Sequence, residues 1–324
     1  MRARAVVVIA AVFALGGCGT VAGTTVPVVA AQVPTPGGVT EAAAPAGVNT
    51  GEDCGDPLAS LAPSGPLPEP GRMPPGSTMD RIVARGKLVV GVDQNTYNFG
   101  FRDPFTGQIQ GFDIDMARAV ARALFGDPSR IQLRALTSEQ RIPAVRDGAV
   151  DIVVRTMSIT CERRREVSFS AVYYDASQRL LVKRDSGITG AADLAGRRVC
   201  ATKGSTSLSH LASLPARPVP VSVADWTDCL VMMQQRQVDA VSTDDVILAG
   251  LAAQDRYTEV VGEPLADEPY GMAIPQQDTD FVRFVNGVLE RIKADGTWTG
   301  AYRHWLGSLL PGPVPDPPEP RYAG

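Results

Sequence analysis

A helix followed by an apolar strand occurs twice in the chain, and both strands end in polar residues. The first copy has a helix near Ser138 to Asp147 before AVDIVVRTM, and the second has an amphipathic helix in WTDCLVMMQQ before VDAVSTDD. The strands share the pattern Val-Asp-x-Val, which places Thr156 opposite Asp244. Ligands of open α/β sheets collect at the carboxyl ends of strands. The pattern predicts an α/β protein with two similar halves and polar groups at those ends; a chance helix and strand similarity is the alternative.

Both ends of the chain differ in composition from its middle. An apolar run at 5–15 follows two arginines, and its length suits a signal sequence better than a membrane span. The next residues, LGGC at 15–18, resemble a bacterial lipobox, in which cleavage leaves Cys18 lipidated. The alternative is an ordinary signal peptide with an incidental cysteine. The Pro-, Gly- and Ala-rich stretch 19–78 is predicted to be a disordered linker, and 311–324 a disordered Pro-rich tail.

Cysteine usage and charge exclude several classes of protein. After Cys18 the chain has four further cysteines, which in an exported protein indicate two disulfides with three possible pairings: Cys54, Cys161, Cys200 and Cys229. The sequence contains no CxxC or CxxH spacing that would indicate a metal site. The net charge is −4 and the basic residues are dispersed, so nucleic-acid binding is not indicated.

Two local patterns at helix starts have a structural and a functional interpretation. Asp113 and Asp115 begin the helix GFDIDMARAVARALFG, where carboxylates favour the helix N-terminus; a metal-binding or catalytic pair is the alternative. Gly204, Ser205 and Thr206 lie between a strand and a helix. They could hold an anion through backbone N–H groups or act as an ordinary N-cap.

Five motifs in the body of the chain occur in the order and spacing of one known family. They are GFDIDMA, MSIT..R...V.FS..Y, L.G.RV....GSTS, VDAV..D and ADGTW...Y..W. From about Asp80 to Leu309 the chain therefore resembles the family 3 extracytoplasmic solute-binding proteins, amino-acid receptors that serve ABC importers. The resemblance implies a type II periplasmic-binding-protein fold: two α/β lobes, two hinge strands and a ligand in the cleft between the lobes. Lobe 1 would comprise 79–177 and 268–310, and lobe 2 would comprise 178–267.

The same resemblance implies a set of ligand-binding residues. Arg163 matches the arginine that pairs with the ligand α-carboxylate, a bidentate geometry that suits a guanidinium. Asp244 matches the acid that receives the α-ammonium. The remaining positions hydrogen-bond the ligand from the two lobes: Thr156, Ser158, Ser205 and Thr206. Arg164 and Arg165 are interpreted as solvated surface charge.

Two stretches depart from the family pattern. Arg155 stands where a small polar residue is common, and a cation there would favour an acidic ligand side chain; Lys203 is a second candidate. The first loop, DQNTYNFGF, lacks the usual aromatic-Pro-aromatic pattern. Tyr97 or Asn98 is expected to cover the ligand, while Phe99 could do so or pack in the core.

The resulting expectation is a monomeric, lipid-anchored receptor on the extracytoplasmic face of the cell membrane. It would bind glutamate, aspartate, glutamine or asparagine without a cofactor and deliver it to an ABC permease. A membrane sensor is an alternative partner. A dehydratase-like enzyme on the same fold is less well supported, because only His210 and His304 could act as imidazole bases. Within this fold Cys200 and Cys229 fall in lobe 2 and are expected to pair, which leaves Cys54 for Cys161.

Overall fold

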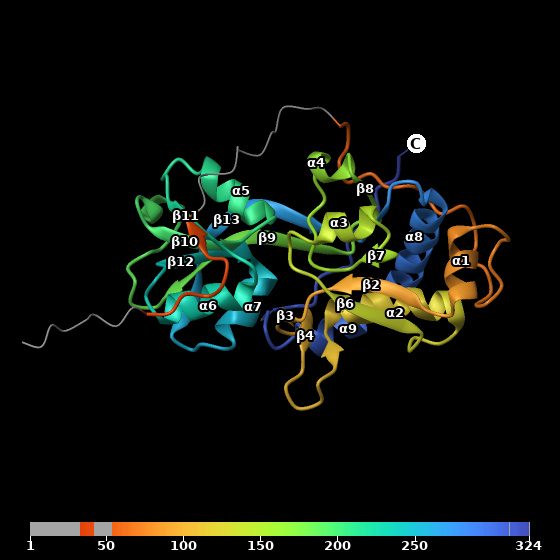
Figure 1. Ribbon diagram of the computed structural model, residues 1–324, viewed down its shortest axis with the longest axis horizontal. Helices are drawn as coiled ribbons and strands as arrows, with labels where there is room; N and C mark the ends of the chain where they lie inside the picture. Colours follow the sequence, from red (N-terminus) through yellow and green to blue (C-terminus); the bar gives the residue numbers. More distant parts are fainter. Residues whose placement is uncertain (1–32, 42–53, 311, 324) are drawn as a thin grey trace, which may run out of the picture. The chain divides into compact units, whose positions relative to one another are not determined.

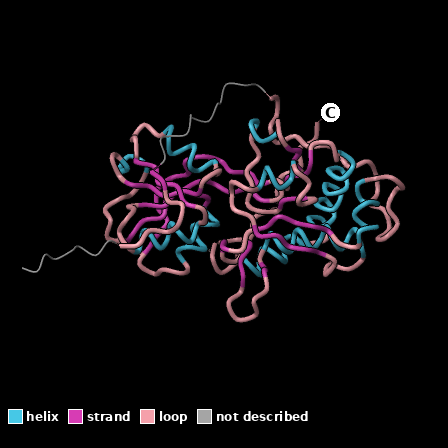
Figure 2. The backbone as a smooth tube through the Cα atoms, in the orientation of Figure 1, coloured by secondary structure: helices cyan, strands magenta, loops and turns pink. Residues whose placement is uncertain are grey.

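The computed structural model describes residues 33–41, 54–310 and 312–323 of the chain (Figure 1). Three sheets form, with five, six and three strands. Figure 2 shows the strands in magenta with the helices in cyan packed around them. The five-stranded and six-stranded sheets are the centres of two α/β lobes, as the sequence predicted.

Lobe 1 is built on the five-stranded sheet. Its strand order is β6 (Ile131–Ala135), β2 (Leu88–Val92), β7 (Ile152–Val153), β14 (Ala273–Pro275) and β8 (Val167–Phe169). Strand β2 is parallel to β6 and β7, while β14 is antiparallel to β7 and β8. Every residue of β2 is buried, because β2 lies inside the sheet between β6 and β7 and α2 packs against it.

Six helices and a small sheet complete lobe 1. The helices are α1 (Thr78–Arg85), α2 (Phe112–Phe125), α3 (Arg141–Arg146), α4 (Cys161–Arg164), α8 (Thr279–Ala294) and α9 (Thr297–Trp305). The small sheet has β3 (Asn95–Thr96), β4 (Gly100–Arg102) and β5 (Ile109–Gln110). Gly111 precedes α2 at φ 132°, and a Cβ there would lie 2.3 Å from the Phe99 carbonyl oxygen. Glycine is therefore required where the first loop meets α2.

Lobe 2 is built on the six-stranded sheet. Its strand order is β1 (Thr40–Glu41), β11 (Val219–Val223), β10 (Arg198–Thr202), β12 (Ala240–Asp244), β9 (Tyr174–Lys183) and β13 (Thr258–Tyr270). The connecting helices are η1 (Ala191–Leu194), α5 (Thr206–Ser213), α6 (Trp226–Gln234) and α7 (Asp245–Ala252). Strand β10 is parallel to both β11 and β12. Parallel neighbours need crossovers, which α5 and α6 provide.

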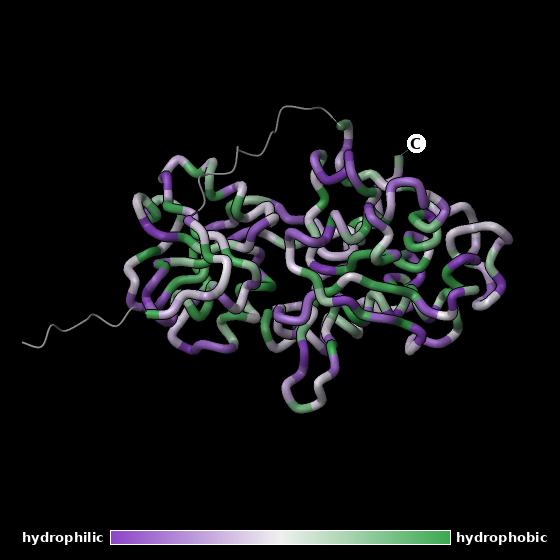
Figure 3. Tube along the Cα trace, viewed as in Figure 1, coloured by the Kyte–Doolittle hydropathy of each residue, from purple (hydrophilic) through white to green (hydrophobic). Residues whose placement is uncertain are grey.

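Two long strands connect the lobes. Strands β9 and β13 pair antiparallel from Tyr174 opposite Tyr270 to Lys183 opposite Thr258. These are the hinge strands that the resemblance implied. In Figure 3 the hydrophobic residues, in green, concentrate along the strands inside each lobe. Polar residues that could contact a ligand therefore lie at the ends of the strands.

The structure differs from the predicted linker over residues 54–77, which pack against lobe 1. Ser60 is buried and donates to the Phe169 carbonyl at 2.7 Å, and it accepts from Asn286 Nδ2 at 2.8 Å. Arg164, interpreted as surface charge, donates to the carbonyls of Pro57 and Ala59 at 2.8 and 2.6 Å. The prediction of disorder is wrong here, because the backbone polar groups of this irregular segment find partners on the lobe rather than in a regular element.

Residues 40–41, also in the predicted linker, form strand β1. They pair antiparallel with Val221 and Ser222 at the edge of the lobe 2 sheet. The hydroxyls of Thr40 and Ser222 lie 2.8 Å apart. The predicted linker thus contributes a short edge strand to lobe 2.

The Pro-rich tail also contacts the body, at residues 312–323. Tyr322 donates to Glu290 Oε1 at 2.7 Å, and Arg321 pairs with Asp56 at 2.7 Å. Lys293 Nζ donates to the Pro318 carbonyl at 2.6 Å. The prediction of a disordered tail is therefore wrong for these residues. Their Pro-rich composition alone could not reveal these contacts.

Both expected disulfides are present. Cys200 pairs with Cys229 inside lobe 2, and Cys54 pairs with Cys161 at the start of α4. None of the helices in the described ranges combines the length and apolarity that a membrane span requires.

Candidate functional site

Two adjoining cavities lie between residues of lobe 1 and residues of lobe 2. The small cavity, of about 10 Å³, is lined by Ser138, Arg141, Thr156, Ser158, Ser205, Thr206, Ser207, Trp226, Asp244 and Ile247. The cleft cavity, of about 460 Å³, shares Ser138, Arg141, Ser205 and Thr206 with it and adds Arg163, Lys203 and others. Seven of the predicted binding residues therefore line one or both of these cavities: Thr156, Ser158, Arg163, Lys203, Ser205, Thr206 and Asp244.

Thr156 and Ser158 follow β7 at its carboxyl end. Thr156 has φ 37°, in the left-handed region that few non-glycine residues adopt. Its backbone N–H donates to Asp113 Oδ2 at 3.0 Å, and Asp113 Oδ1 accepts from the Tyr173 hydroxyl at 2.7 Å. Asp113 lies in the first turn of α2 but makes no side-chain cap hydrogen bond there; it is fully buried and holds the strand end in the geometry that lines the small cavity.

Arg163 lies in α4 and reaches back to the strand end. Thr160 caps this helix through its side chain. Arg163 donates to the Ser158 carbonyl at 2.7 Å and, across the cleft, to the Gly204 carbonyl at 3.2 Å. Burial lowers the pKa of the Arg163 guanidinium, because it is removed from water. The group has only carbonyl partners here, so a ligand carboxylate would complete it.

Ser205 and Thr206 begin α5 on the lobe 2 side. The Ser205 hydroxyl caps the helix by accepting from the Leu208 N–H at 3.1 Å. Thr206 donates to Glu268 Oε2 at 2.7 Å and lies 3.4 Å from the Ser158 hydroxyl. The N-cap interpretation of this turn is correct, and its side chains also line both cavities.

Asp244 ends β12, as Thr156 follows β7. Its Oδ2 accepts from the Tyr270 hydroxyl, whereas Oδ1 is buried without a hydrogen-bond partner. Burial, reinforced by the nearby Glu268 carboxylate, raises the pKa of Asp244 well above its ordinary value. Burial also acts to raise the pKa of Glu268, but hydrogen bonds from His210, Ser158 and Thr206 leave it lowered. A ligand ammonium would give Asp244 Oδ1 a charged hydrogen-bond donor in direct contact.

Arg155 does not face the ligand space, contrary to the prediction from its place on the strand. It is 0% exposed, lies 3.1 Å from Asp93 Oδ2, and lines neither cavity. It also donates to the Leu136 carbonyl at 2.7 Å and to Ser138 Oγ at 2.8 Å. The proposed role in reading side-chain charge is wrong, because Asp93 already neutralises this guanidinium inside lobe 1.

The other predicted specificity residues lie at the margin. Lys203 lines the cleft cavity with a 62% exposed side chain that pairs with Glu139 at 2.9 Å. Tyr97 is 38% exposed and packs edge-on against Phe101. Asn98 donates to the Trp305 carbonyl at 2.8 Å, and neither it nor Tyr97 lines either cavity.

For Phe99 the sequence allowed either a lid over the ligand or a position in the core. It is fully buried against Tyr174 and Tyr270. No lid residue of the first loop therefore covers the two cavities in this structure.

Sequence reasoning missed Arg141, which lines both cavities. It begins α3, is 3% exposed, and shares a buried face with Val145 four residues later. That spacing was the one available signal: an arginine on the apolar face of a short helix. Burial lowers the pKa of Arg141, and the positive charges of Arg163 and Arg155 act in the same direction.

The lobes are closed over the small cavity. Arg141 and Arg163 of lobe 1 both donate to the Gly204 carbonyl of lobe 2, at 3.1 and 3.2 Å. A Cβ at Gly204 would lie 2.8 Å from the Cα of Glu139, so glycine permits this approach. A cavity of about 10 Å³ has room for about one water, so the lobes must separate to admit an amino acid.

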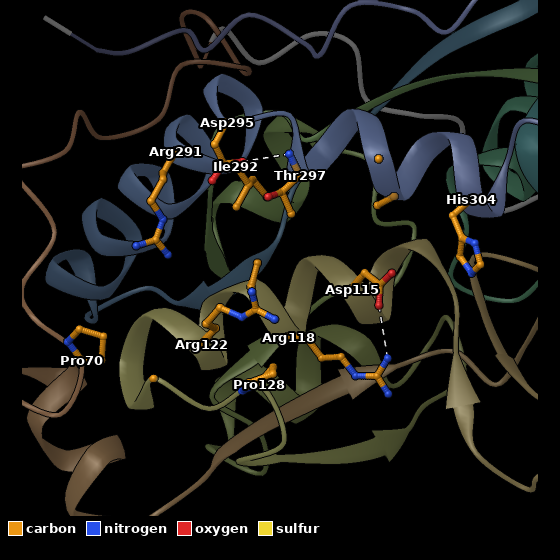
Figure 4. Close-up of a pocket in the computed structure, with 14 residues that line it drawn as sticks. Pro70, Asp115, Arg118, Arg122, Pro128, Arg291, Ile292, Asp295, Thr297 and His304 are labelled. Atoms are coloured by element: carbon orange, nitrogen blue, oxygen red, sulfur yellow. Dashed lines mark hydrogen bonds and ion pairs between the residues drawn. The ribbon is translucent and has the colours of Figure 1, made fainter.

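Other features do not belong to this cleft. A cavity of about 710 Å³ lies between α2, α8 and α9 of lobe 1, lined by Arg118, Arg122, Arg291 and His304 among others (Figure 4). His210 lines neither cleft cavity; its Nδ1 lies 2.6 Å from Gln178 Oε1. The described residues contain no group of three or more side chains suited to a metal ion. Cys18 lies outside the described residues.

We expect Asp113 to make the stability of the folded protein depend on pH. Burial raises its pKa from 3.8 to about 7, so the folded protein binds this proton more tightly than the unfolded chain does. The associated stability is present below pH 3.8 and is lost as pH rises through about 7, a change of up to about 4 kcal/mol. Asp113→Asn should therefore gain melting temperature relative to the parent between pH 5 and pH 8, measured by thermal unfolding.

Asp103→Asn is the matched control for this experiment. Asp103 is exposed, and hydrogen bonds from the Thr106 and Phe105 N–H groups lower its pKa, so it titrates below the tested range. Parallel melting curves for Asp113→Asn and the parent across pH 5–8 would contradict the assignment.

Two α/β lobes on paired hinge strands, with buried groups of opposite charge facing one cleft, define a two-lobed solute receptor. The chain belongs to the bacterial extracellular solute-binding proteins, family 3, whose family description matches residues 88–308. It is 35% identical over 250 residues to the ABC transporter glutamine-binding protein GlnH of Bacillus subtilis (strain 168), covering 77% of this chain and 92% of that one. It is 27% identical to the glutamate/aspartate import solute-binding protein of Salmonella typhimurium, covering 75% and 84% of the two chains.

Solved structures agree with this assignment. The P235GK mutant of ArgBP from T. maritima superposes with a TM-score of 0.66 at 30% identity, covering 71% of this chain and 99% of that one. An ancestral arginine-binding protein bound to glutamine gives 0.63 at 32% identity, covering 69% and 99%. The fold is that of type II periplasmic binding proteins, as the motifs implied.

Proposed function

We propose that the chain is a lipid-anchored extracytoplasmic receptor that binds glutamate, aspartate or one of their amides for ABC import. One observation carries the proposal: Arg163 of lobe 1 and Asp244 of lobe 2 line two cavities that share four lining residues, and neither side chain forms an ion pair among the described residues. An α-carboxylate suits the first group and an α-ammonium the second. The names of relatives, which include glutamine-binding and glutamate/aspartate import proteins, support this ligand class.

Binding proceeds by lobe closure rather than by chemistry. The open lobes admit the amino acid, and Arg163, Thr156 and Ser158 hold its carboxylate end. Rotation about β9 and β13 then brings Ser205, Thr206 and Asp244 onto it, replacing the direct contacts made at Gly204.

A thermal-shift screen of the purified protein against the twenty common amino acids tests the proposal. A ligand present at 100 times its dissociation constant should stabilise the protein by about 2.7 kcal/mol. Stabilisation by glutamate, aspartate, glutamine or asparagine is the expected result. Stabilisation by none of the twenty would reject the amino-acid assignment.

Anchoring at Cys18 has its own test. Because lipidation requires this thiol, Cys18→Ala should leave unprocessed precursor or material lost from the membrane fraction. Fractionation of cells followed by detection of the chain gives the measurement. A variant that fractionates and migrates like the parent would reject the lipobox interpretation.

A further inference from the structure

A tyrosine stands at the lobe 1 end of each hinge strand. Tyr173 directly precedes β9, and Tyr270 is the last residue of β13. The Tyr173 N–H donates to the Tyr270 carbonyl at 3.0 Å, and the two ring centroids lie 6.2 Å apart. Both tyrosines are fully buried, and neither lines either cleft cavity. Their hydroxyls therefore need partners inside the protein.

Each of these hydroxyls donates to the carboxylate of a buried aspartate. Tyr270 donates to Oδ2 of Asp244, at the end of the lobe 2 strand β12. Tyr173 donates to Asp113 Oδ1 at 2.7 Å, and the other oxygen of Asp113 accepts from the Thr156 N–H at 3.0 Å. Asp244 and Thr156 both line the small cavity. One hinge tyrosine thus reaches the lobe 2 half of the site, and the other reaches the lobe 1 half.

The Tyr270 hydroxyl is held in place by its surroundings. The ring stacks on Tyr174 with centroids 5.6 Å apart and meets Phe99 edge-on at 6.0 Å. The backbone of Tyr270 pairs with Tyr174 on β9 and forms a bridge with Ser158 after β7. A fixed hydroxyl fixes the carboxylate oxygen that it binds, which is Oδ2 of Asp244. The second oxygen, Oδ1, is buried without a hydrogen-bond partner among the described residues and is left for a ligand.

We infer that Tyr270 and Tyr173 are positioning residues of the amino-acid site, each orienting one half of it from the hinge through a buried aspartate. This inference rests on the proposed amino-acid binding and extends it to two residues outside the cavities. Tyr270 holds Asp244 so that Oδ1 receives the α-ammonium, and Tyr173 holds Asp113 against the Thr156 N–H. Loss of either hydroxyl leaves a buried carboxylate oxygen without its donor, so the carboxylate is no longer held in one orientation.

Calorimetric titration of glutamate and glutamine from pH 5 to pH 9 tests the inference on the parent, Tyr270→Phe and Tyr173→Phe. Both variants keep the ring and lose only the hydroxyl. Tyr270→Phe should weaken the two ligands by the same factor, about 10-fold or more, because both carry the α-ammonium and hydrogen bonds to charged groups are strong. Tyr173→Phe should weaken both by about threefold or more, because it acts on the ligand only through Asp113 and Thr156.

The pH profile of the affinity separates orientation of Asp244 from simple packing. The titratable and charged groups around Asp244 come from both lobes and the hinge: Glu268, Tyr270, Asp245, Arg141, Arg163 and Tyr174. Burial and the Glu268 carboxylate raise the pKa of Asp244, whereas the hydrogen bond from Tyr270 lowers it. An ammonium pairs with the ionised carboxylate, so affinity falls as pH falls through this pKa. Tyr270→Phe should therefore lose affinity at a higher pH than the parent, a shift that Tyr173→Phe should not show.

Tyr302→Phe is the matched control. Tyr302 is a buried tyrosine of the same aromatic cluster, stacked on Tyr174, but its hydroxyl is bound to neither Asp113 nor Asp244. Its affinities and pH profile should equal those of the parent.

Three results would overturn the inference while leaving the proposed function intact, because the parent would still bind its ligand. They are an affinity of Tyr270→Phe within about twofold of the parent, a loss of equal size at every pH, and an equal loss in Tyr302→Phe. If Tyr270→Phe does not fold, Tyr173→Phe decides: a loss of about threefold or more supports the inference, and an unchanged affinity overturns it. Absence of amino-acid binding by the parent would overturn the proposed function and this inference together.

Discussion

Replacing Arg163 by alanine is expected to weaken every amino-acid ligand by about 2–5 kcal/mol, a loss of about 30-fold to several thousandfold in affinity. The guanidinium is the cationic partner proposed for the α-carboxylate, and its removal leaves that carboxylate buried without a counter-charge. Because all amino acids share this group, glutamate and glutamine should lose the same factor. Calorimetric titration of both ligands measures it.

Arg164→Ala provides the control for Arg163. It removes the same charge from the same helix, but Arg164 donates to Pro57 and Ala59 and lines neither cleft cavity. Its ligand affinities should stay within about threefold of the parent. If Arg163→Ala behaves like Arg164→Ala, the carboxylate is held elsewhere. If it weakens the acids alone, Arg163 contacts the ligand side chain rather than the α-carboxylate.

Replacing Asn286 by alanine is expected to lower the free energy of unfolding by about 3 kcal/mol, because it leaves buried polar groups unpaired. Asn286 is fully buried on α8. It accepts from the Ala171 N–H at 2.7 Å and donates to Ser60 Oγ and the Leu61 carbonyl, both at 2.8 Å. Urea unfolding measures the change, and faster proteolytic cleavage within residues 54–77 should accompany it.

Glu290→Ala is the control one turn further along α8. Glu290 is exposed, and among the described residues its side chain accepts a hydrogen bond from Tyr322. Its cost should stay below about 1 kcal/mol. Equal stability of the two variants, with unchanged cleavage, would show that the ordered N-terminal segment does not depend on Asn286.

Much of the site could be predicted because its residues stand at the ends of recognisable strands and at the start of a recognisable helix. Thr156 and Ser158 follow one strand, Asp244 ends another, and Ser205 caps the helix after a third. A strand that ends in a sheet places its last residues at one edge, so the local pattern located Thr156 and Asp244. The ligand-binding roles of Ser158 and Ser205 were implied by the resemblance to the family.

Which lobe 1 arginine lines the cavities could not be predicted in this way. Arg155 and Arg141 are both lobe 1 arginines close to the same strand end, and the sequence favoured Arg155. Asp93, more than fifty residues away, neutralises Arg155, whereas Arg141 finds only carbonyls. Which arginine keeps an unbalanced charge depends on partners that meet only when the sheet and α3 have packed.

The sequence by itself determined the two α/β lobes, the order of their strands and helices, the pairing of the cysteines within a known fold, and the strand ends that carry the clamp. The repeated helix and strand pattern follows from periodicity, a local property, whereas the two-lobed fold, the cysteine pairing and the clamp residues were implied by the resemblance of the motifs to the family. Only the tertiary structure decided that residues 54–77 and 312–323 pack on lobe 1, that Arg155 is a core residue, and that Arg141, Trp226 and Ser138 meet in one cavity. The physical reason is the same in each case. Whether a buried polar group is hydrogen-bonded or charge-paired depends on a partner distant in sequence, and only folding brings that partner into place.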